Sequence, residues 1–222
     1  HSLQFVSKCG IRLRSPREPL VRVKHYDTSR AHIEARVEGT LRALRVERLD
    51  LLLIHRPDPL LDADEVAEAF CALKQSGKVL AFGVSNFAPR QLELLQSRLP
   101  FALLANQIEC SLKKSEPLFD GTLDQCQRMR MMPMAWSPLG GGQLATPGGP
   151  LASALAEIGS ELRLSPEQLA LAWLLRHPAG IAPVIGTGRR DRMEAAARVM
   201  SVELDRQSWF MLLEAARGHS VP

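Results

Sequence analysis

The sequence has 222 residues, of which 45% are hydrophobic and 23% are charged, and its formal net charge is +4. This composition is typical of a soluble globular chain that is long enough for one substantial core. Basic residues do not cluster with aromatic ones, and no apolar run reaches about 18 residues, so we expect neither a nucleic-acid partner nor a membrane span. The four cysteines are scattered without metal-ligand spacing. That pattern favours free thiols in a cytoplasmic protein without a metal centre.

In the first half of the chain, short apolar runs alternate with helical patterns that begin at capping residues. The expected elements are a strand at 3–10, a charged surface loop at 11–29, a helix at 30–44 that begins after Thr28 or Ser29, a strand at 50–55, a helix at 62–77, a strand at 78–86, a helix from Pro89 through Leu99, and a strand at 103–110.

The same alternation continues in the second half. The expected elements are a helix at 118–129, a strand at 133–139, a mobile glycine-rich segment at 140–150, helices at 151–162 and 166–177, a strand at 181–186, and helices at 189–200 and 205–218. Six strands that alternate with helices predict a parallel sheet covered by helices. A doubly wound sheet usually has a glycine-rich turn after its first strand. Residues 9–12 lack one, so we expect an α/β fold of the (β/α)8 TIM-barrel type.

The stretch 50–57 is the clearest strand of the chain, because its apolar residues run without alternation before His55, Arg56 and Pro57. In a barrel, the loops at the carboxyl ends of the strands build the site. His55 is therefore a candidate catalytic residue, although an isolated histidine at such a position more often caps the strand or is satisfied within the core.

Polar or aromatic residues also end the other predicted strands, and in a barrel these ends converge on one face. The strand ends are Lys8, His55, Ser85-Asn86, Asn106-Gln107, Trp136-Ser137 and Gly186-Thr187. A purely packed sheet has no need of such a set, so we interpret it as a functional site. Core packing remains the alternative for Trp136.

Across essentially its whole length the chain resembles the aldo-keto reductase family, and within it a bacterial subgroup of YdhF-type oxidoreductases. The matching stretches are residues 6–8 (VSK), 50–57 (DLLLIHRP, continuing into Asp58-Pro59), 83–87 (GVSNF), 106–109 (NQIE), 135–140 (AWSPLG), the turn 186–192 (GTGRRDR) and Trp209-Phe210 near the end.

The resemblance implies a reaction in which hydride passes from a nicotinamide to a carbonyl carbon while a tyrosine hydroxyl protonates the oxygen. Lys8 matches the lysine that lowers the pKa of this tyrosine, and His55 matches the histidine that orients the carbonyl. A phenol is a weak acid with a pKa of about 10, so a neighbouring ammonium group makes proton transfer feasible at neutral pH.

The resemblance also implies the residues that hold NADP(H). Ser85, Asn86 and Gln107 match those that bind the carboxamide, and Trp136 takes the place of the ring that stacks on the nicotinamide. Arg192 matches the residue for the 2′-phosphate, which favours NADPH over NADH. The further cofactor-binding residues implied are Ser137, Leu139, Gly186 and Thr187. The family's usual lysine is Gly186 here, and its adenine-contacting pair is Ala195-Ala196.

The family's aspartate and acid tyrosine belong to the first two βα units of its barrel. Counted from the lysine strand, residues 1–222 hold units three to eight of one barrel domain, truncated at the N-terminus. The single tyrosine, Tyr26, matches no catalytic position.

The leading hypothesis is thus an NADPH-dependent oxidoreductase that reduces aldehydes or ketones to alcohols and whose N-terminal quarter is lacking from this sequence. The partner is a small carbonyl substrate, and we expect the full-length protein to be a monomer. Two alternatives remain open. One is a non-catalytic nucleotide-binding barrel that acts as a sensor or partner subunit, and the other is a truncated product without function.

Overall fold

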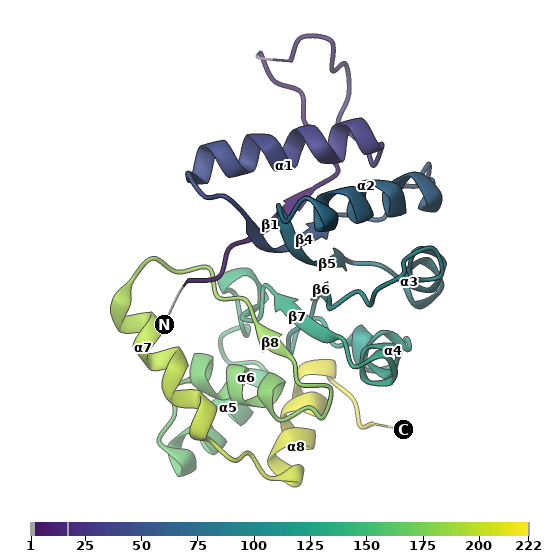
Figure 1. Cartoon of the computed structure of the whole chain (residues 1–222). Helices are drawn as coiled ribbons and strands as arrows, with labels where there is room; N and C mark the ends of the chain where they lie inside the picture. Colours follow the sequence, from purple (N-terminus) through teal and green to yellow (C-terminus); the bar gives the residue numbers. More distant parts are fainter. Residues whose placement is uncertain (1–2, 17, 222) are drawn as a thin grey trace. The chain divides into compact units, whose positions relative to one another are not determined.

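The computed structural model describes residues 3–16 and 18–221. They form two compact units, residues 1–107 and 108–222, which are treated separately below. Figure 1 labels the elements of both units.

The first unit is built on parallel strands with helices between them, as the alternation in the sequence predicts. Its elements are β1 (Val6–Cys9), β2 (Ile11–Arg12), β3 (His25–Tyr26), α1 (Arg30–Leu44), β4 (Leu49–Ile54), α2 (Ala63–Gln75), β5 (Val79–Ser85), α3 (Pro89–Gln96) and the first residues of β6 (Ala105–Glu109).

Strands β1, β4, β5 and β6 pair in that order, all parallel. Residues 51–54 of β4 are buried, which explains the unbroken apolar run, since both faces of this strand are covered. Figure 1 shows α1 and α2 lying side by side along the strands. The carboxyl ends of four neighbouring strands therefore lie along one edge of this sheet.

The second unit is mostly helical. Its elements are η1 (Glu116–Leu118), α4 (Thr122–Met129), β7 (Met132–Trp136), η2 (Gly140–Gly142), α5 (Pro150–Leu162), α6 (Pro166–Leu175), β8 (Ala182–Pro183), α7 (Arg190–Ala197), η3 (Arg198–Ser201) and α8 (Arg206–Arg217).

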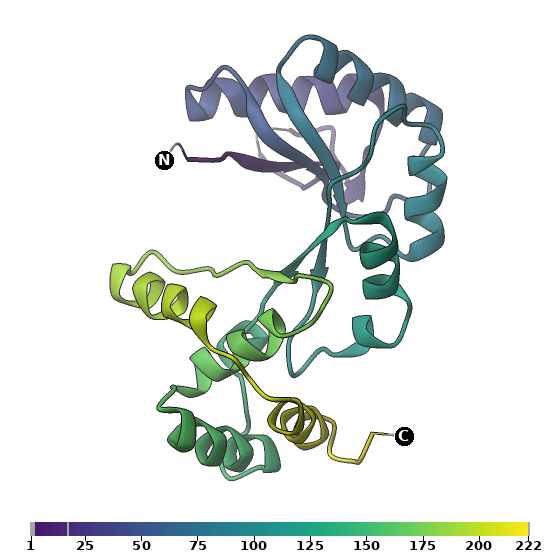
Figure 2. The same ribbon diagram turned by 60° about the horizontal axis from the view of Figure 1, so that its bottom comes forward.

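Strands β7 and β8 of this unit pair in parallel. Helices α5, α6 and α8 pack on one another, as Figures 1 and 2 show. The indoles of Trp173 and Trp209 stack with ring centroids 5.0 Å apart. Each indole N–H donates to the backbone carbonyl of the other tryptophan, at 3.1 and 2.9 Å. This reciprocal pair joins α6 to α8 and satisfies two donors that would otherwise be buried without a partner.

Several expected elements differ from those observed. The strands at 3–10 and 181–186 are shorter than predicted, and β8 has two residues, of which Pro183 cannot donate to a ladder. The loop 11–29 contains the antiparallel ribbon β2–β3, where Gly10 turns the chain with a φ of +99°. The helix from Pro89 ends at Gln96, so Leu99, which precedes a proline, lies outside it.

The remaining differences lie in the second unit. The helix at 118–129 is divided by Gly121, whose φ of +85° interrupts the helical backbone. The glycine-rich segment 140–150 begins with the short helix η2, and its mobility stays a prediction. None of the helices in residues 3–16 and 18–221 combines the length and apolarity that a bilayer crossing needs.

Candidate functional site

The first unit brings five of the predicted site residues together at the carboxyl ends of its strands. Lys8 is in β1, His55 directly follows β4, Ser85 ends β5, and Gln107 is in β6. Ser85 and Gln107 are register partners, and Asn86 is the next residue after β5. Because neighbouring parallel strands end on the same side of a sheet, these side chains share one edge.

Hydrogen bonds converge on Gln107. Lys8 Nζ donates to its side-chain Oε1 at 2.6 Å. Ser85 Oγ and the backbone N–H of Asn86 both donate to its carbonyl, at 2.8 and 2.9 Å, and Asn86 Nδ2 donates to Ser85 Oγ at 2.8 Å. Asn86 has a φ of +58°, a conformation that asparagine tolerates better than most residues. In this conformation both the backbone N–H and the side-chain amide of Asn86 donate hydrogen bonds within the network.

The charges around His55 are predominantly positive. Burial lowers its pKa from the ordinary value of 6.5, and the cations Lys8, Arg56 and Lys24 lower it further. Burial and the neighbouring Arg56 also lower the pKa of the Lys8 ammonium. At neutral pH the imidazole is therefore uncharged and can donate a hydrogen bond from one ring nitrogen. The Lys8 ammonium therefore gives up its proton more readily than the ammonium of a fully solvated lysine.

Asn106, the other predicted strand-end residue, has a different place. Its side chain is fully buried, and its Nδ2 donates to the carbonyl of Phe87 at 2.9 Å. Its Oδ1 is buried and has no hydrogen-bond partner within the described ranges. Asn106 thus holds the loop that follows β5.

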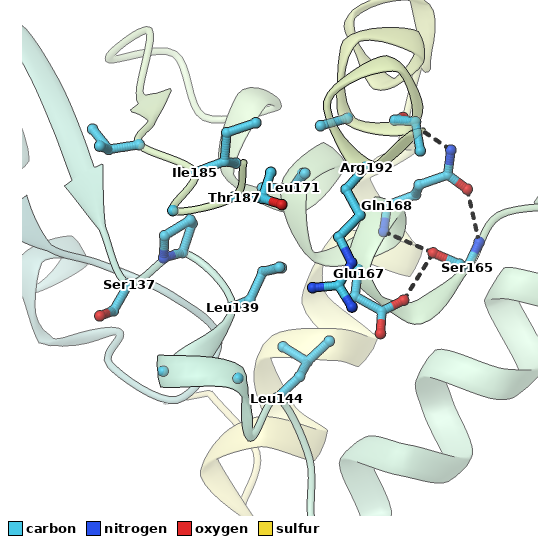
Figure 3. Close-up of a pocket in the computed structure, with 17 residues that line it drawn as sticks. Ser137, Leu139, Leu144, Ser165, Glu167, Gln168, Leu171, Ile185, Thr187 and Arg192 are labelled. Atoms are coloured by element: carbon cyan, nitrogen blue, oxygen red, sulfur yellow. Dashed lines mark hydrogen bonds between the residues drawn. The ribbon is translucent and has the colours of Figure 1, made fainter. Parts of the chain in front are cut away.

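The second unit contains a pocket of about 760 Å³ between the end of β7, the start of α6 and the turn before α7 (Figure 3). Five predicted cofactor-binding residues line it, namely Ser137, Leu139, Gly186, Thr187 and Arg192. Arg192 points from α7 into the pocket. Trp136 does not line this pocket; it is half-buried at the end of β7.

The turn that opens α7 is held by its own side chains. Thr187 Oγ1 accepts the backbone N–H of Arg189 at 3.1 Å, and Arg189 pairs with Asp191 at 2.6 Å. The helix begins at Arg190, one residue later than predicted. Arg192 is therefore in the first turn of the helix, and its side chain points into the pocket.

The sequence predicts a helix at 166–177 but does not predict that the start of this helix lines the pocket. Ser165 caps α6 in a capping box with Gln168, and Gln168 Nε2 donates to the carbonyl of Ala195 in α7 at 3.0 Å. Ser165, Glu167 and Gln168 all line the pocket. A polar capping box indicates where a helix begins, but the pattern does not predict which part of the structure the first turn of that helix contacts.

Two further predictions concern chemistry near these sites. Tyr26 is half-buried in β3, where it pairs with Ile11 of β2. It is therefore part of the short antiparallel ribbon β2–β3. Among the described residues, no group of three histidine, cysteine or acidic side chains could hold a metal ion.

The comparisons with known proteins explain this arrangement. The sequence model of the Aldo/keto reductase family matches residues 3–217. The chain belongs to the aldo/keto reductase family. Its α/β barrel fold class follows, since two solved family members share the fold.

Three relatives match nearly the whole chain. The uncharacterized oxidoreductase YcsN of Bacillus subtilis is 48% identical over 100% of this chain and 75% of its own length. Oxidoreductase YdhF of Escherichia coli is 50% identical, and 6-dehydroglucose reductase of Agrobacterium fabrum is 49% identical, each over 99% of this chain and 74% of its own length. The resemblance to the YdhF group is thus confirmed.

Two solved structures are similar. The thermostable aldo-keto reductase Tm1743, crystallised with the inhibitor epalrestat, has a TM-score of 0.79 and 26% identity over 85% of this chain and 67% of its own. The aldo/keto reductase of Klebsiella pneumoniae, crystallised with NADP and acetate, has a TM-score of 0.77 and 23% identity over 98% of this chain and 70% of its own. The second similarity supports the fold only. Whether residues 1–222 make up one domain, and whether two βα units precede them, stay predictions.

Proposed function

We propose that the protein is an NADPH-dependent oxidoreductase that reduces aldehyde or ketone carbonyls to alcohols. Family membership and the oxidoreductase names of close relatives support this function. The observation that carries it is the 2.6 Å hydrogen bond from Lys8 to Gln107 beside His55. This bond joins the residue assigned to proton transfer with a residue assigned to the cofactor's carboxamide.

The pocket of the second unit fits the adenosine end of NADP(H). Its volume lies within the range of about 300–1,000 Å³ that is usual for small-molecule sites, and Arg192 supplies a guanidinium of the kind that pairs with a phosphate. Ala195 and Ala196 give part of the wall an apolar surface. Membership of the aldo/keto reductase family supports NADP(H) as the cofactor.

In the first unit, Ser85, Asn86 and Gln107 would hold the carboxamide, since the network offers amide donors and acceptors. When bound, NADPH supplies the hydride for the carbonyl carbon. His55, uncharged at neutral pH, would donate a hydrogen bond to the carbonyl oxygen and orient it. Lys8, with its lowered pKa, would favour delivery of a proton toward the same oxygen.

A non-catalytic nucleotide-binding role is the second candidate. It is favoured by one observation, namely that the only tyrosine of residues 1–222, Tyr26, lies in β3 and outside the strand-end network. Both candidate functions require cofactor binding, but only the oxidoreductase reduces a carbonyl substrate.

The name of the relative from Agrobacterium fabrum suggests a substrate class. We infer that oxidised sugars with an aldehyde or ketone group are candidate substrates, because the relative named 6-dehydroglucose reductase is 49% identical. A sugar carbonyl offers hydroxyl groups for hydrogen bonding beside the reacting carbon, so it would be distinguished from an aliphatic aldehyde by binding strength.

The test uses the protein at its natural full length. NADPH binding is measured first by tryptophan fluorescence. NADPH oxidation is then followed by the loss of reduced-nicotinamide absorbance with aliphatic aldehydes, aromatic aldehydes and oxidised sugars. Binding with turnover is expected. Binding without turnover on any carbonyl would favour the non-catalytic candidate, and absence of binding would contradict both.

A further inference from the structure

The pocket of the second unit contains a carboxylate as well as a guanidinium. Glu167, at the second position of α6, lines the same pocket as Arg192 of α7. In Figure 3 the Arg192 side chain points into the pocket on the side to which α6 brings Glu167. A ligand that reaches Arg192 therefore enters the field of both charges.

The carboxylate is held in place by the helix cap. Ser165 Oγ donates to Glu167 Oε2 at 2.9 Å, and the Ser165–Gln168 capping box fixes the backbone of the same turn. No ion pair of Glu167 or Arg192 is present among the residues that the structure describes. The two charges thus share the pocket without neutralising each other at contact distance.

Opposite charges of this kind have opposite effects on the two nicotinamide cofactors. An arginine accommodates a 2′-phosphate, whereas an acidic residue accepts a hydrogen bond from the free ribose 2′-hydroxyl. A carboxylate in the same pocket repels the phosphate, which carries up to two negative charges. Gly186, where the family has a lysine, adds no cation to offset this repulsion.

We propose that Glu167 sets the cofactor preference of this pocket by opposing the 2′-phosphate, so that NADPH is favoured over NADH less strongly than Arg192 alone would allow. The proposal rests on the proposed function, because it assigns the adenosine end of the cofactor to this pocket. It adds a specificity-determining residue that the motifs of the sequence do not mark.

The test measures binding of two fragments, adenosine 2′,5′-bisphosphate and adenosine 5′-phosphate, by isothermal titration calorimetry. Fragments report on this pocket without turnover. For Glu167→Gln we expect the preference for the 2′-phosphorylated fragment to rise roughly two- to fivefold, the range typical of one exposed charge interaction. Affinity for adenosine 5′-phosphate should stay the same or fall, since an amide accepts the 2′-hydroxyl less well.

Glu161→Gln is the matched control, because Glu161 is an exposed glutamate near the end of α5 and does not line the pocket. It should leave the preference unchanged. Glu167→Ala, which removes the carboxylate without an amide, should raise the preference as well, and thermal melting verifies that each variant is folded. A folded Glu167→Gln protein with an unchanged preference would overturn the proposal, as would an equal change for both fragments. If the wild-type protein bound neither fragment, the assigned site and the proposed function would both be wrong.

Discussion

At the scale of single residues, strands β1 and β4 position Lys8 and His55, and the surroundings of both side chains lower their pKa values. The strand end places Lys8 beside Gln107, and partial desolvation lowers the pKa of its ammonium. Burial lowers the pKa of His55, and the three neighbouring cations lower it further. A buried or crowded group of this kind is more often functional than a freely solvated one.

Lys8→Met tests the assigned proton-transfer role. In the full-length protein we expect kcat to fall by about 10²–10⁴-fold, the usual contribution of a positioned acid or base. NADPH affinity should change little, although the loss of the bond to Gln107 can weaken it somewhat. Steady-state kinetics and fluorescence titration separate the two effects. A kcat within about twofold of wild type would contradict the assignment.

The pKa of His55 provides a second prediction. Its NMR titration midpoint should lie below 6.5, and it should rise when a neighbouring cation is removed, more in Lys8→Met than in Lys24→Gln, because Lys8 is the stronger of the two influences. Arg48→Gln is the control, since Arg48 precedes β4 at its opposite end. A midpoint at or above 6.5 in the wild-type protein would contradict the described surroundings of His55.

This shift has a consequence for stability, with a definite sign. The folded-state pKa is lower than the unfolded value of 6.5, so the unfolded chain binds the proton more readily. The contribution of His55 to stability is therefore complete above pH 6.5 and is lost as the pH falls from there toward the lowered pKa. Chemical denaturation measured at several pH values across this window should show a smaller loss of the free energy of unfolding for Lys24→Gln than for the wild-type protein.

At the scale of elements, Gly83 shows how closely β5 and its neighbours pack. A Cβ placed on Gly83 would lie about 2.4 Å from the carbonyl oxygen of Ala105 and 2.7 Å from Leu53 Cδ2. The strands must shift to admit a methyl group. We expect Gly83→Ala to lower the free energy of unfolding by about 1–3 kcal/mol, the usual cost of overpacking a core.

Gly39 is the matched control for this substitution. It lies within α1, and a Cβ there meets no atom within 4 Å. Gly39→Ala should raise the free energy of unfolding by about 0.5–1 kcal/mol, because alanine favours the helix. Urea denaturation of both variants measures the two changes, and a destabilisation by Gly39→Ala or a neutral Gly83→Ala would contradict the described packing.

The elements also show what the sequence could reveal. Local patterns predict a helix at 30–44 capped by Thr28 or Ser29 and a buried strand at 50–55. The structure has the cap at Ser29, the helix at 30–44 and the strand at 49–54, within one residue of these predictions. The ribbon β2–β3 could not be foreseen, because it depends on pairing between residues that lie 13 and 15 positions apart in the chain. Lys8, His55 and Gln107 were identified as strand ends, but their hydrogen bonds depend on the register of the sheet. Glu167 enters the pocket through the packing of α6, which no motif encodes.

At the scale of the whole molecule, the chain has two groups of functional residues, one in each unit. We propose that the strand-end network of the first unit carries the chemistry and that the pocket of the second unit binds the adenosine end of the cofactor. The proposed function therefore requires both units. Family membership is established by a match over residues 3–217.

The strands β1 and β8 have one neighbour each within the described residues. Such edges expose backbone donors and acceptors that pair readily with another chain. When residues 1–222 are expressed, we therefore expect self-association in analytical ultracentrifugation. A species that stays monomeric over the whole concentration range would contradict this expectation.

The most direct measurement for the account as a whole is a comparison of NADPH and NADH binding by the full-length protein and its Arg192→Ala variant. Calorimetric titration is expected to show tighter binding of NADPH than of NADH. In Arg192→Ala the NADPH affinity should decrease by about 1.5–3 kcal/mol, as for a hydrogen bond to a charged group, and the NADH affinity should hardly change. Equal affinities for the two cofactors before mutation would contradict the central claim that Arg192 recognises the 2′-phosphate.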